Sequence, residues 1–163
     1  MKIAIVEDRP WVMESSIKEM RNIGLNVVQM VYFCNNGAQI CDVEEMCNKY
    51  ELDLCCVDNG NFEEELNKLY EDKEMIFLFD MDLIGDYSSH FDERINTIYA
   101  KKKRAEEGGD GRIWFYTNGP TSAVEQINLN FKNRRIPVRD FDTTKNQLIF
   151  DYDFMKKNIL KQG

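Results

Sequence analysis

Two aspartates follow a short apolar run near the middle of the chain. Residues 75–79 have the composition of a strand buried on both faces, and Asp80 and Asp82 come directly after them. Aspartate is a common turn residue, so the pair taken alone fits a solvated turn equally well. The chemistry open to Asp80 and Asp82 therefore depends on which side chains the fold brings beside them.

Other polar side chains stand at the ends of predicted strands, as Asp80 does. They are Glu7 and Asp8 after residues 3–6, Thr117 after residues 113–116, and Arg139 within residues 136–140. In an open parallel sheet the carboxyl ends of the strands form one rim, and ligands bind there. We therefore expect these side chains to gather at that rim.

Carboxylates that converge at a rim repel one another unless a cation neutralises them. Oxygen ligands with this charge favour Mg²⁺, so the sequence predicts a magnesium site made by Glu7, Asp8, Asp80 and Asp82. An aspartate beside Mg²⁺ is suited to attack phosphorus. Asp80 is the candidate nucleophile.

The elements that must position these residues alternate along the chain. Strands are predicted at residues 3–6, 27–33, 75–80, 113–116 and 136–140, and helices near 10–23, 62–70, 90–104, 121–131 and 151–161. A further short helix at 42–50 and a short strand at 54–57 are predicted between the second and third of these strands. Such alternation predicts a single α/β domain over residues 1–163, with a doubly wound parallel five-stranded sheet and helices on both faces.

Composition narrows the class of protein. The net charge of -8 argues against a general nucleic-acid surface, although Lys132 to Arg135 form a local basic run. The five cysteines form no C-x-x-C pair and there is one histidine, so we expect free thiols rather than a zinc site. No signal peptide or membrane-spanning run is visible, which predicts a cytoplasmic protein without a membrane partner.

The motifs resemble a response-regulator receiver domain. Residues 2–8 (KIAIVED) are similar to that family's first strand with its acidic pair, and residues 79–86 (FDMDLIGD) are similar to the phosphoacceptor strand end and the loop after it. Thr117 stands where the family has its switch serine or threonine. The resemblance covers most of the chain and implies a stand-alone signalling module, not a turnover enzyme.

Specific roles follow from the resemblance. It implies that Asp80 accepts the phosphoryl group, that Asp8 and Asp80 hold Mg²⁺ with the backbone carbonyl of Asp82, that Glu7 assists through water, and that Thr117 bonds a phosphoryl oxygen. The implied partners are a sensor histidine kinase or a small phosphodonor, and a downstream protein or a second copy of the chain.

Some positions depart from the receiver pattern. Arg139 stands where the family has a lysine, and Ile136 stands at the position of the aromatic switch residue. Asp8 and Asp80 are 72 positions apart (80 − 8), more than is usual in a receiver domain, which implies an insertion within residues 34–60. The resemblance therefore implies an atypical receiver, and a receiver-like module that works without phosphorylation stays open.

A second family shares two of the motifs. Asp80-Met81-Asp82 and Thr117-Asn118 also resemble the haloacid dehalogenase-like phosphatases, in which Asp80 would be the nucleophile and Asp82 the general acid and base. That family's remaining residues would be Asp140 and Asp142 for its last acidic pair and Lys132 or Lys145 for its lysine. Those enzymes begin close to the D-x-D strand, whereas this chain has a strand, a helix and a strand before it.

Overall fold

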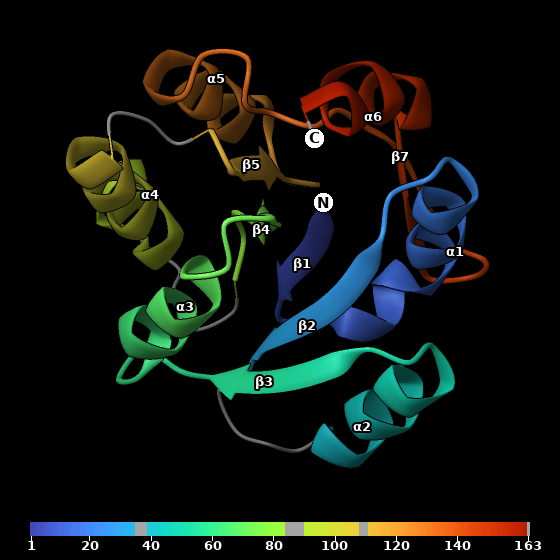
Figure 1. Ribbon diagram of the computed structural model, residues 1–163. Coiled ribbons are helices and arrows are strands. Elements are labelled where there is room, and N and C mark those ends of the chain that lie inside the picture. Colours follow the sequence, from blue (N-terminus) through green and yellow to red (C-terminus); the bar gives the residue numbers. More distant parts are fainter. Residues whose placement is uncertain (35–38, 84–89, 108–110, 163) are drawn as a thin grey trace.

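The chain folds around a parallel sheet of five strands. The computed structural model describes residues 1–34, 39–83, 90–107 and 111–162. The strands are β1 (Lys2–Glu7), β2 (Val27–Phe33), β3 (Asp53–Val57), β4 (Met75–Asp80) and β5 (Ile113–Tyr116), and their order in the sheet is β3-β2-β1-β4-β5 (Figure 1). The predicted doubly wound α/β architecture is confirmed.

Helices cover both faces of the sheet. The α-helices are α1 (Glu14–Asn22), α2 (Ile40–Lys49), α3 (Phe62–Tyr70), α4 (Ile95–Glu107), α5 (Thr121–Asn130) and α6 (Tyr152–Asn158), and the short 3-10 helices are η1 (Pro10–Met13), η2 (Phe91–Glu93) and η3 (Leu160–Gln162). In Figure 1, α1, α2 and α6 lie on one side of the sheet, and α3, α4 and α5 lie on the other. Each predicted helix is therefore present in the described part of the chain, with somewhat different ends.

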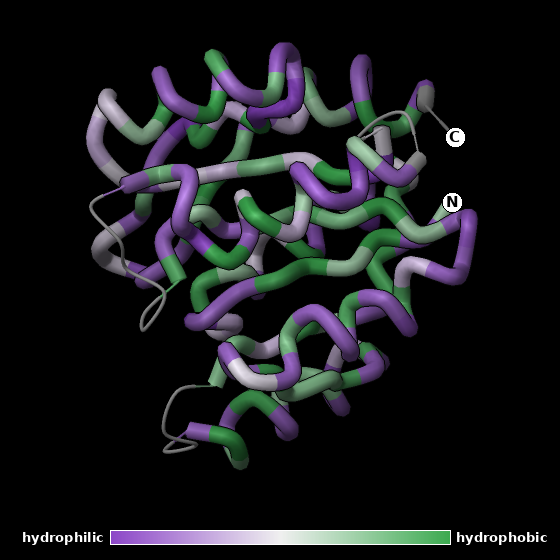
Figure 2. Tube along the Cα trace, turned by 90° about the vertical axis from the view of Figure 1, so that its left-hand side faces the viewer, coloured by the Kyte–Doolittle hydropathy of each residue, from purple (hydrophilic) through white to green (hydrophobic). Residues whose placement is uncertain are grey.

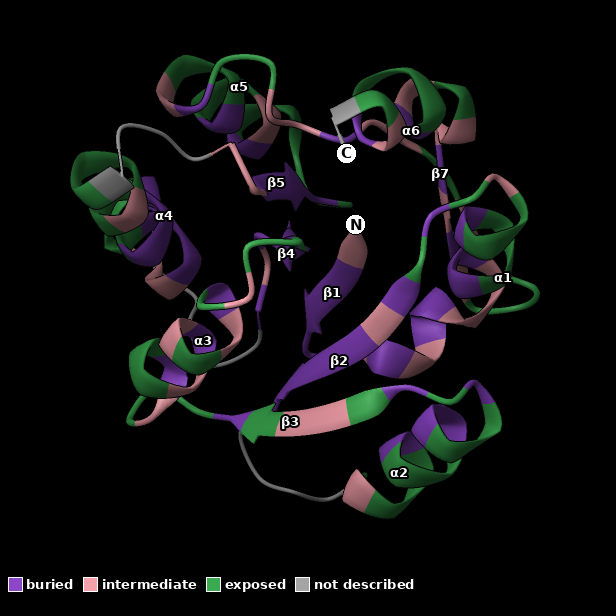
Figure 3. Cartoon of the chain, viewed as in Figure 1, coloured by how far each residue is buried: buried purple, intermediate pink, exposed green. Residues whose placement is uncertain are grey.

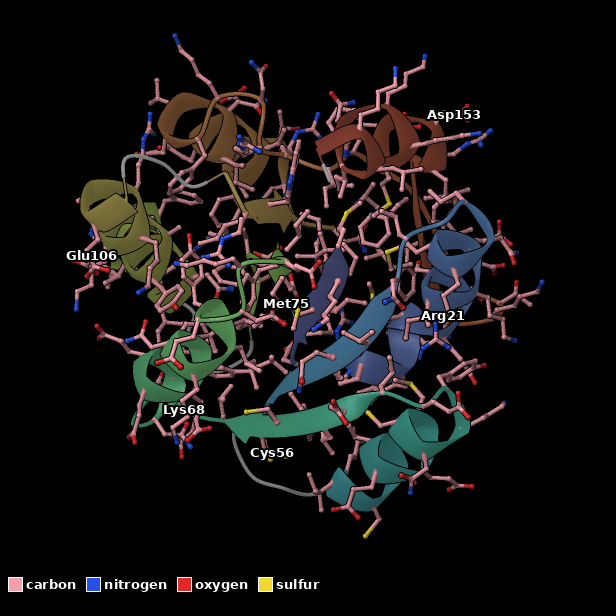
Figure 4. The ribbon with its side chains drawn as sticks, in the orientation of Figure 1. Arg21, Cys56, Lys68, Met75, Glu106 and Asp153 are labelled. Carbon is pink, nitrogen blue, oxygen red and sulfur yellow. The ribbon has the colours of Figure 1, made fainter. Side chains whose placement is uncertain are left out.

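The two faces of the sheet form two separate apolar clusters. Successive strand side chains point to opposite faces, so Ile5 and Leu78 pack with α1, α2 and α6, whereas Val6 and Phe79 pack with α3, α4 and α5. Figure 2 shows apolar stretches running through the middle of the molecule, and in Figure 3 the strands of the parallel sheet are almost entirely buried, except for the edge strand β3. In Figure 4 Met75 lies in the interior, while Lys68, Glu106 and Asp153 lie at the outside of their helices.

Residues 34–60 contribute an added edge to the sheet. In the part that the structure describes, this segment forms α2 and β3, close to the helix and strand predicted there. β3 pairs in parallel with β2, with Val31 opposite Cys55. The segment between the second and third predicted strands therefore extends the sheet on the side away from β4.

The strand predicted at residues 136–140 forms as β6 (Val138–Asp142), but its expected place in the parallel sheet is wrong. Only Arg135 bridges β5, opposite Phe115, and the backbone N–H of Ile136 donates to the Phe115 carbonyl at 2.7 Å. The chain then leaves the sheet at Pro137 and forms β6 (Val138–Asp142), which pairs antiparallel with β7 (Gln147–Phe150). The sequence analysis missed β7, and a nearby hairpin partner costs less loop-closure entropy than a distant strand.

The order of the strands creates a switch point. From β1 the chain moves outward to β2 and β3, and then returns to the other side of β1 to form β4 and β5. In sheets of this type ligands bind beyond the carboxyl ends of the strands where that direction reverses. This place lies between the ends of β1 and β4.

Candidate functional site

Three carboxylates meet at the switch point, and we call them the three-carboxylate group. Glu7 ends β1, Asp8 follows it, and Asp80 ends β4. Each offers a carboxylate oxygen, and these oxygens lie within 4.8 Å of one another. The three residues are only 1%, 6% and 5% exposed, respectively. The structure thus brings together three of the four predicted metal ligands.

The register of the sheet explains why Glu7 and Asp80 face each other. Val6 lies opposite Phe79 in the parallel ladder, so the next residue on each strand is again a neighbour. The Oε1 atom of Glu7 accepts the backbone N–H groups of Asp8 and Arg9, each at 3.1 Å. These bonds fix the Glu7 carboxylate against the first turn after β1.

Tyr116 completes the surroundings of Glu7. Its hydroxyl donates a 2.6 Å hydrogen bond to Glu7 Oε2, and both residues are buried. Tyr116 lies opposite Asp80 in the ladder between β4 and β5, which places it beside the same carboxylates. The sequence analysis treated Tyr116 as a strand residue only, although its position at the end of β5 was a usable signal.

Burial governs the protonation of the group. Burial raises the pKa of Glu7 well above the ordinary value, and the negative charges of Asp80 and Asp8 raise it further. Burial also raises the pKa of Asp80, as does the charge of Asp8, while hydrogen bonds from Glu7 and from the backbone of Asp82 work in the opposite direction. The group therefore needs a bound proton or a cation at neutral pH.

The donor set fits a hard divalent cation. All three side chains offer oxygen, which is the ligand that Mg²⁺ prefers. Within the described ranges, no basic side chain lies within ion-pair distance of Glu7 or Asp80. In an octahedral Mg²⁺ site with bonds of about 2.1 Å, neighbouring oxygens lie about 3.0 Å apart and opposite ones about 4.2 Å apart, so the three carboxylates would draw closer together on binding the ion.

Asp82 belongs to a separate group, which we call the Asp82 group. Its backbone N–H donates to Asp80 Oδ1 at 3.0 Å, but its side chain turns toward Thr117, whose hydroxyl donates to Asp82 Oδ2. The Thr117 oxygen in turn accepts the backbone N–H of Gly119 at 2.9 Å. The side chain of Asp82 thus contacts the predicted switch residue Thr117, while its backbone N–H bonds to Asp80.

Gly119 is required by this packing. A Cβ atom at position 119 would lie 2.7 Å from Asp82 Oδ2 and 2.9 Å from Thr117 Oγ1. Both contacts are shorter than atoms tolerate without movement. The backbone of the loop after β5 therefore closes directly over the Asp82 carboxylate.

Arg94 supplies the positive charge beside Asp82. Its Nη1 atom lies 3.6 Å from Asp82 Oδ1 and 3.3 Å from the carbonyl oxygen of Met81, and its side chain is 12% exposed. The guanidinium also lies 5.5 Å from the centre of the Phe91 ring. Helical periodicity does not predict what an arginine side chain contacts, so the sequence offered no signal for Arg94 at this site.

Arg139 does not reach the carboxylates. It is exposed on β6, and no described residue forms an ion pair or hydrogen bond with its side chain. It shares a pocket of about 420 Å³ with Thr117 and Gly119. The expectation that Arg139 stands at a strand end of the parallel sheet is wrong, because β6 pairs with β7.

The remaining residues of the phosphatase interpretation lie elsewhere. Asp140 and Asp142 are in β6, where their side chains accept backbone N–H groups of the same hairpin. Neither belongs to the three-carboxylate group. Ile84 to Asp86, the end of the acidic stretch, lies outside the described residues.

One polar contact to the site had no sequence signal. The side-chain amide of Asn96, in the first turn of α4, donates to the backbone carbonyl of Asp80. Asn96 is 1% exposed. This bond ties the amino end of α4 to the carboxyl end of β4.

Comparison with protein-family models, with curated proteins and with solved structures gave no match at the threshold of significance. The functional argument therefore depends on the geometry of this chain. Among the described residues, no helix has the length and apolar character needed to cross a membrane.

Proposed function

We propose that the chain is a receiver-like signalling module in which Asp80 accepts a phosphoryl group. The observation that carries the proposal is the three-carboxylate group at the switch point, with Asp82 and Thr117 directly beside it. Fold analogy contributes part of the inference, and the site residues contribute the rest.

The chemistry assigned to the side chains is nucleophilic. A carboxylate oxygen of Asp80 attacks the phosphorus of the donor, the new P–O bond forms, and the donor's leaving group departs with the electron pair of the broken bond. The attack requires the ionised form of Asp80, which burial disfavours. Glu7, Asp8 and Asp80 would hold Mg²⁺, which would neutralise the carboxylates and the incoming phosphoryl oxygens.

Thr117 and Arg94 are the groups poised to respond to the modification. The Thr117 hydroxyl now donates to Asp82, and a phosphoryl group on Asp80 would compete for it. Arg94 is the nearby guanidinium, and a fork of N–H donors suits phosphoryl oxygens. Phosphorylation adds about −1.5 to −2 of charge if an acyl phosphate resembles other phosphorylated side chains.

The output of such a module is a change of partner. A new charge beside Asp82 would redistribute the contacts of Thr117 and Arg94, which connect β4, the loop after β5 and the start of α4. The proposed donor is a sensor histidine kinase or a small phosphodonor, and the proposed receiver of the signal is a downstream protein or a second copy of the chain. A cytoplasmic location is part of this proposal.

Intact-mass measurement with acetyl phosphate tests the proposal. The full chain with Mg²⁺ is expected to gain the mass of one phosphoryl group, and Asp80→Asn is expected to gain none. Asp153→Asn, which changes an exposed acid on α6, is the matched control and should behave as the wild type does. Removal of Mg²⁺ should abolish the adduct.

Other outcomes identify the rival functions. An adduct that persists in Asp80→Asn would exclude Asp80 as the acceptor. No adduct, together with no Mg²⁺-dependent change in the fluorescence of the two tryptophans, Trp11 and Trp114, would favour a module that works without phosphorylation. Sustained hydrolysis of a generic phosphomonoester, lost in both Asp80→Asn and Asp82→Asn, would favour a phosphatase.

A further inference from the structure

A basic segment follows α5 in a chain that is acidic overall. Residues 132–139 contain Lys132, Arg134, Arg135 and Arg139 and no acidic residue, whereas the whole chain has a net charge of -8. The segment runs from the end of α5 past the edge of β5 into β6. Its charge therefore contrasts with that of the rest of the molecule.

Among the described residues, Arg134 is the one basic side chain of this segment that bonds to another part of the fold. Arg134 donates to the carbonyl oxygen of Gly111 at 3.2 Å and lies 4.8 Å from the centre of the Trp114 ring. The side chains of Lys132, Arg135 and Arg139 form no hydrogen bond or ion pair with any described residue. The Nε atom of Arg135 is also buried. Leaving a buried donor without an acceptor costs free energy, so the guanidinium of Arg135 is not fully satisfied by the described residues.

Two pockets meet at Arg135. One, of about 420 Å³, is lined by Arg135 and Arg139 together with Thr117, Asn118 and Gly119. The other, of about 380 Å³, is also lined by Arg135 and includes Lys132. Pockets of this size suit small molecules. Asp140 also lines the first pocket, but its Oδ1 atom accepts the backbone N–H of Phe141.

We propose that the pocket between Arg135 and Arg139 binds the phosphate group of a small phosphorylated molecule. Two guanidinium groups offer planar pairs of N–H donors that match phosphate oxygens, and the amide of Asn118 lies in the same pocket. Lys132, in the adjoining pocket, would attract a second anionic group of the same molecule.

The charge of the protein and the size of its pockets favour a small anionic ligand over a nucleic acid. A nucleic acid would be repelled by the net charge of -8, and it would find only a short basic segment. A small anion would contact the residues of the two pockets and little of the remaining, acidic surface. The proposal does not depend on phosphorylation of Asp80, because none of the three-carboxylate residues lines either pocket.

Isothermal titration calorimetry of the Asp80→Asn full chain without Mg²⁺ tests this site while the acidic site is disabled. The probes are inorganic phosphate, glucose 6-phosphate and ADP, with sodium chloride as the anion control and a DNA oligonucleotide as the macromolecular comparison. We expect saturable binding of at least one phosphorylated probe. Tighter binding of an ester than of inorganic phosphate would identify an organic ligand, and the reverse order would identify free phosphate; both support the site.

Matched variants locate the binding. Arg139→Gln, at an exposed position that cannot disturb the core, and Arg135→Gln are each expected to weaken binding about tenfold or more. Lys145→Gln removes the same charge from the nearby hairpin turn and should leave binding unchanged. Equal weakening by all three variants, no saturable binding of any probe, or tighter binding of a DNA oligonucleotide would each overturn the proposal.

Discussion

Asp80 and Asp82 are two residues apart and have opposite electrostatic surroundings. Asp80 lies in the three-carboxylate group, among like charges and out of water. Asp82 has a hydroxyl donor from Thr117 and the guanidinium of Arg94 beside it. The first arrangement is incomplete without a proton or a cation, whereas the second is balanced by the chain itself. We therefore expect removal of charge to have opposite effects on stability at the two positions.

The largest effect is expected for Asp80→Asn in protein freed of divalent cations. Because burial raises the pKa of Asp80, the native state retains a proton that the unfolded chain has already lost, and stability falls as pH rises through that pKa. The free energy of unfolding of the wild type should fall by about 2 kcal/mol or more between about pH 5 and pH 8. Urea denaturation of both proteins measures this.

The free energy of unfolding of Asp80→Asn should depend less on pH than that of the wild type. At about pH 8 the variant should be the more stable of the two proteins. Adding Mg²⁺ should recover stability in the wild type and have little effect in Asp80→Asn, because bound cation replaces the proton. A wild type that becomes more stable as pH rises, in the absence of divalent cations, would contradict the description of the three-carboxylate group as uncompensated.

Gly119→Ala tests the close packing of the Asp82 group. The new methyl would meet Asp82 Oδ2 and Thr117 Oγ1 at distances that require movement, so we expect a loss of about 1–3 kcal/mol in the free energy of unfolding. Gly60→Ala is the control, because its Cβ would meet only Asp58 Oδ1, at 3.3 Å. An equal effect of both substitutions in urea denaturation would argue against a specific contact at Gly119.

Tyr116→Phe distinguishes the role of the hydroxyl from that of the ring. The variant keeps the buried ring but removes the 2.6 Å hydrogen bond to Glu7, which leaves a buried acceptor less well satisfied. We expect a loss of about 1–2 kcal/mol in the free energy of unfolding. Tyr152→Phe, which removes a 3.1 Å bond to Ser16, should cost less because its partner is a neutral hydroxyl. The reverse order would show that Glu7 gains little from Tyr116.

Strand positions could be predicted from the sequence because the apolar runs are short and end abruptly. The same runs place Glu7 and Asp80 at neighbouring strand ends, so their encounter follows from parallel pairing alone. Arg139 could not be placed in this way, because its position depends on whether β6 pairs with β5 or with β7. Whether β6 pairs with β5 or with β7 depends on tertiary contacts, which the local sequence pattern does not predict.

Side chains that approach the site from helices were harder to predict. Arg94 and Asn96 act through the angle at which the start of α4 meets the end of β4. Helical periodicity gives the face on which a residue lies, but the packing of the helix decides what that face contacts. The resemblance to receiver domains therefore predicted a basic residue of the site on a strand, at Arg139, whereas the guanidinium beside Asp82 is that of Arg94.

Arg94→Gln and Arg139→Gln compare the two arginines directly, and the expected effects on stability are the smallest of those predicted here. Arg94 is nearly buried and interacts with Asp82 and Met81, so its removal should cost about 0.5–1 kcal/mol in the free energy of unfolding. Arg139 has no described partner for its side chain, so its removal should leave stability unchanged within about 0.5 kcal/mol. In the acetyl phosphate assay Arg94→Gln should lower the yield of the Asp80 adduct, and Arg139→Gln should leave that yield unchanged. Arg139→Gln should instead weaken the binding of small phosphates measured by calorimetry. Loss of adduct in Arg139→Gln alone would instead assign Arg139 the role of the receiver lysine.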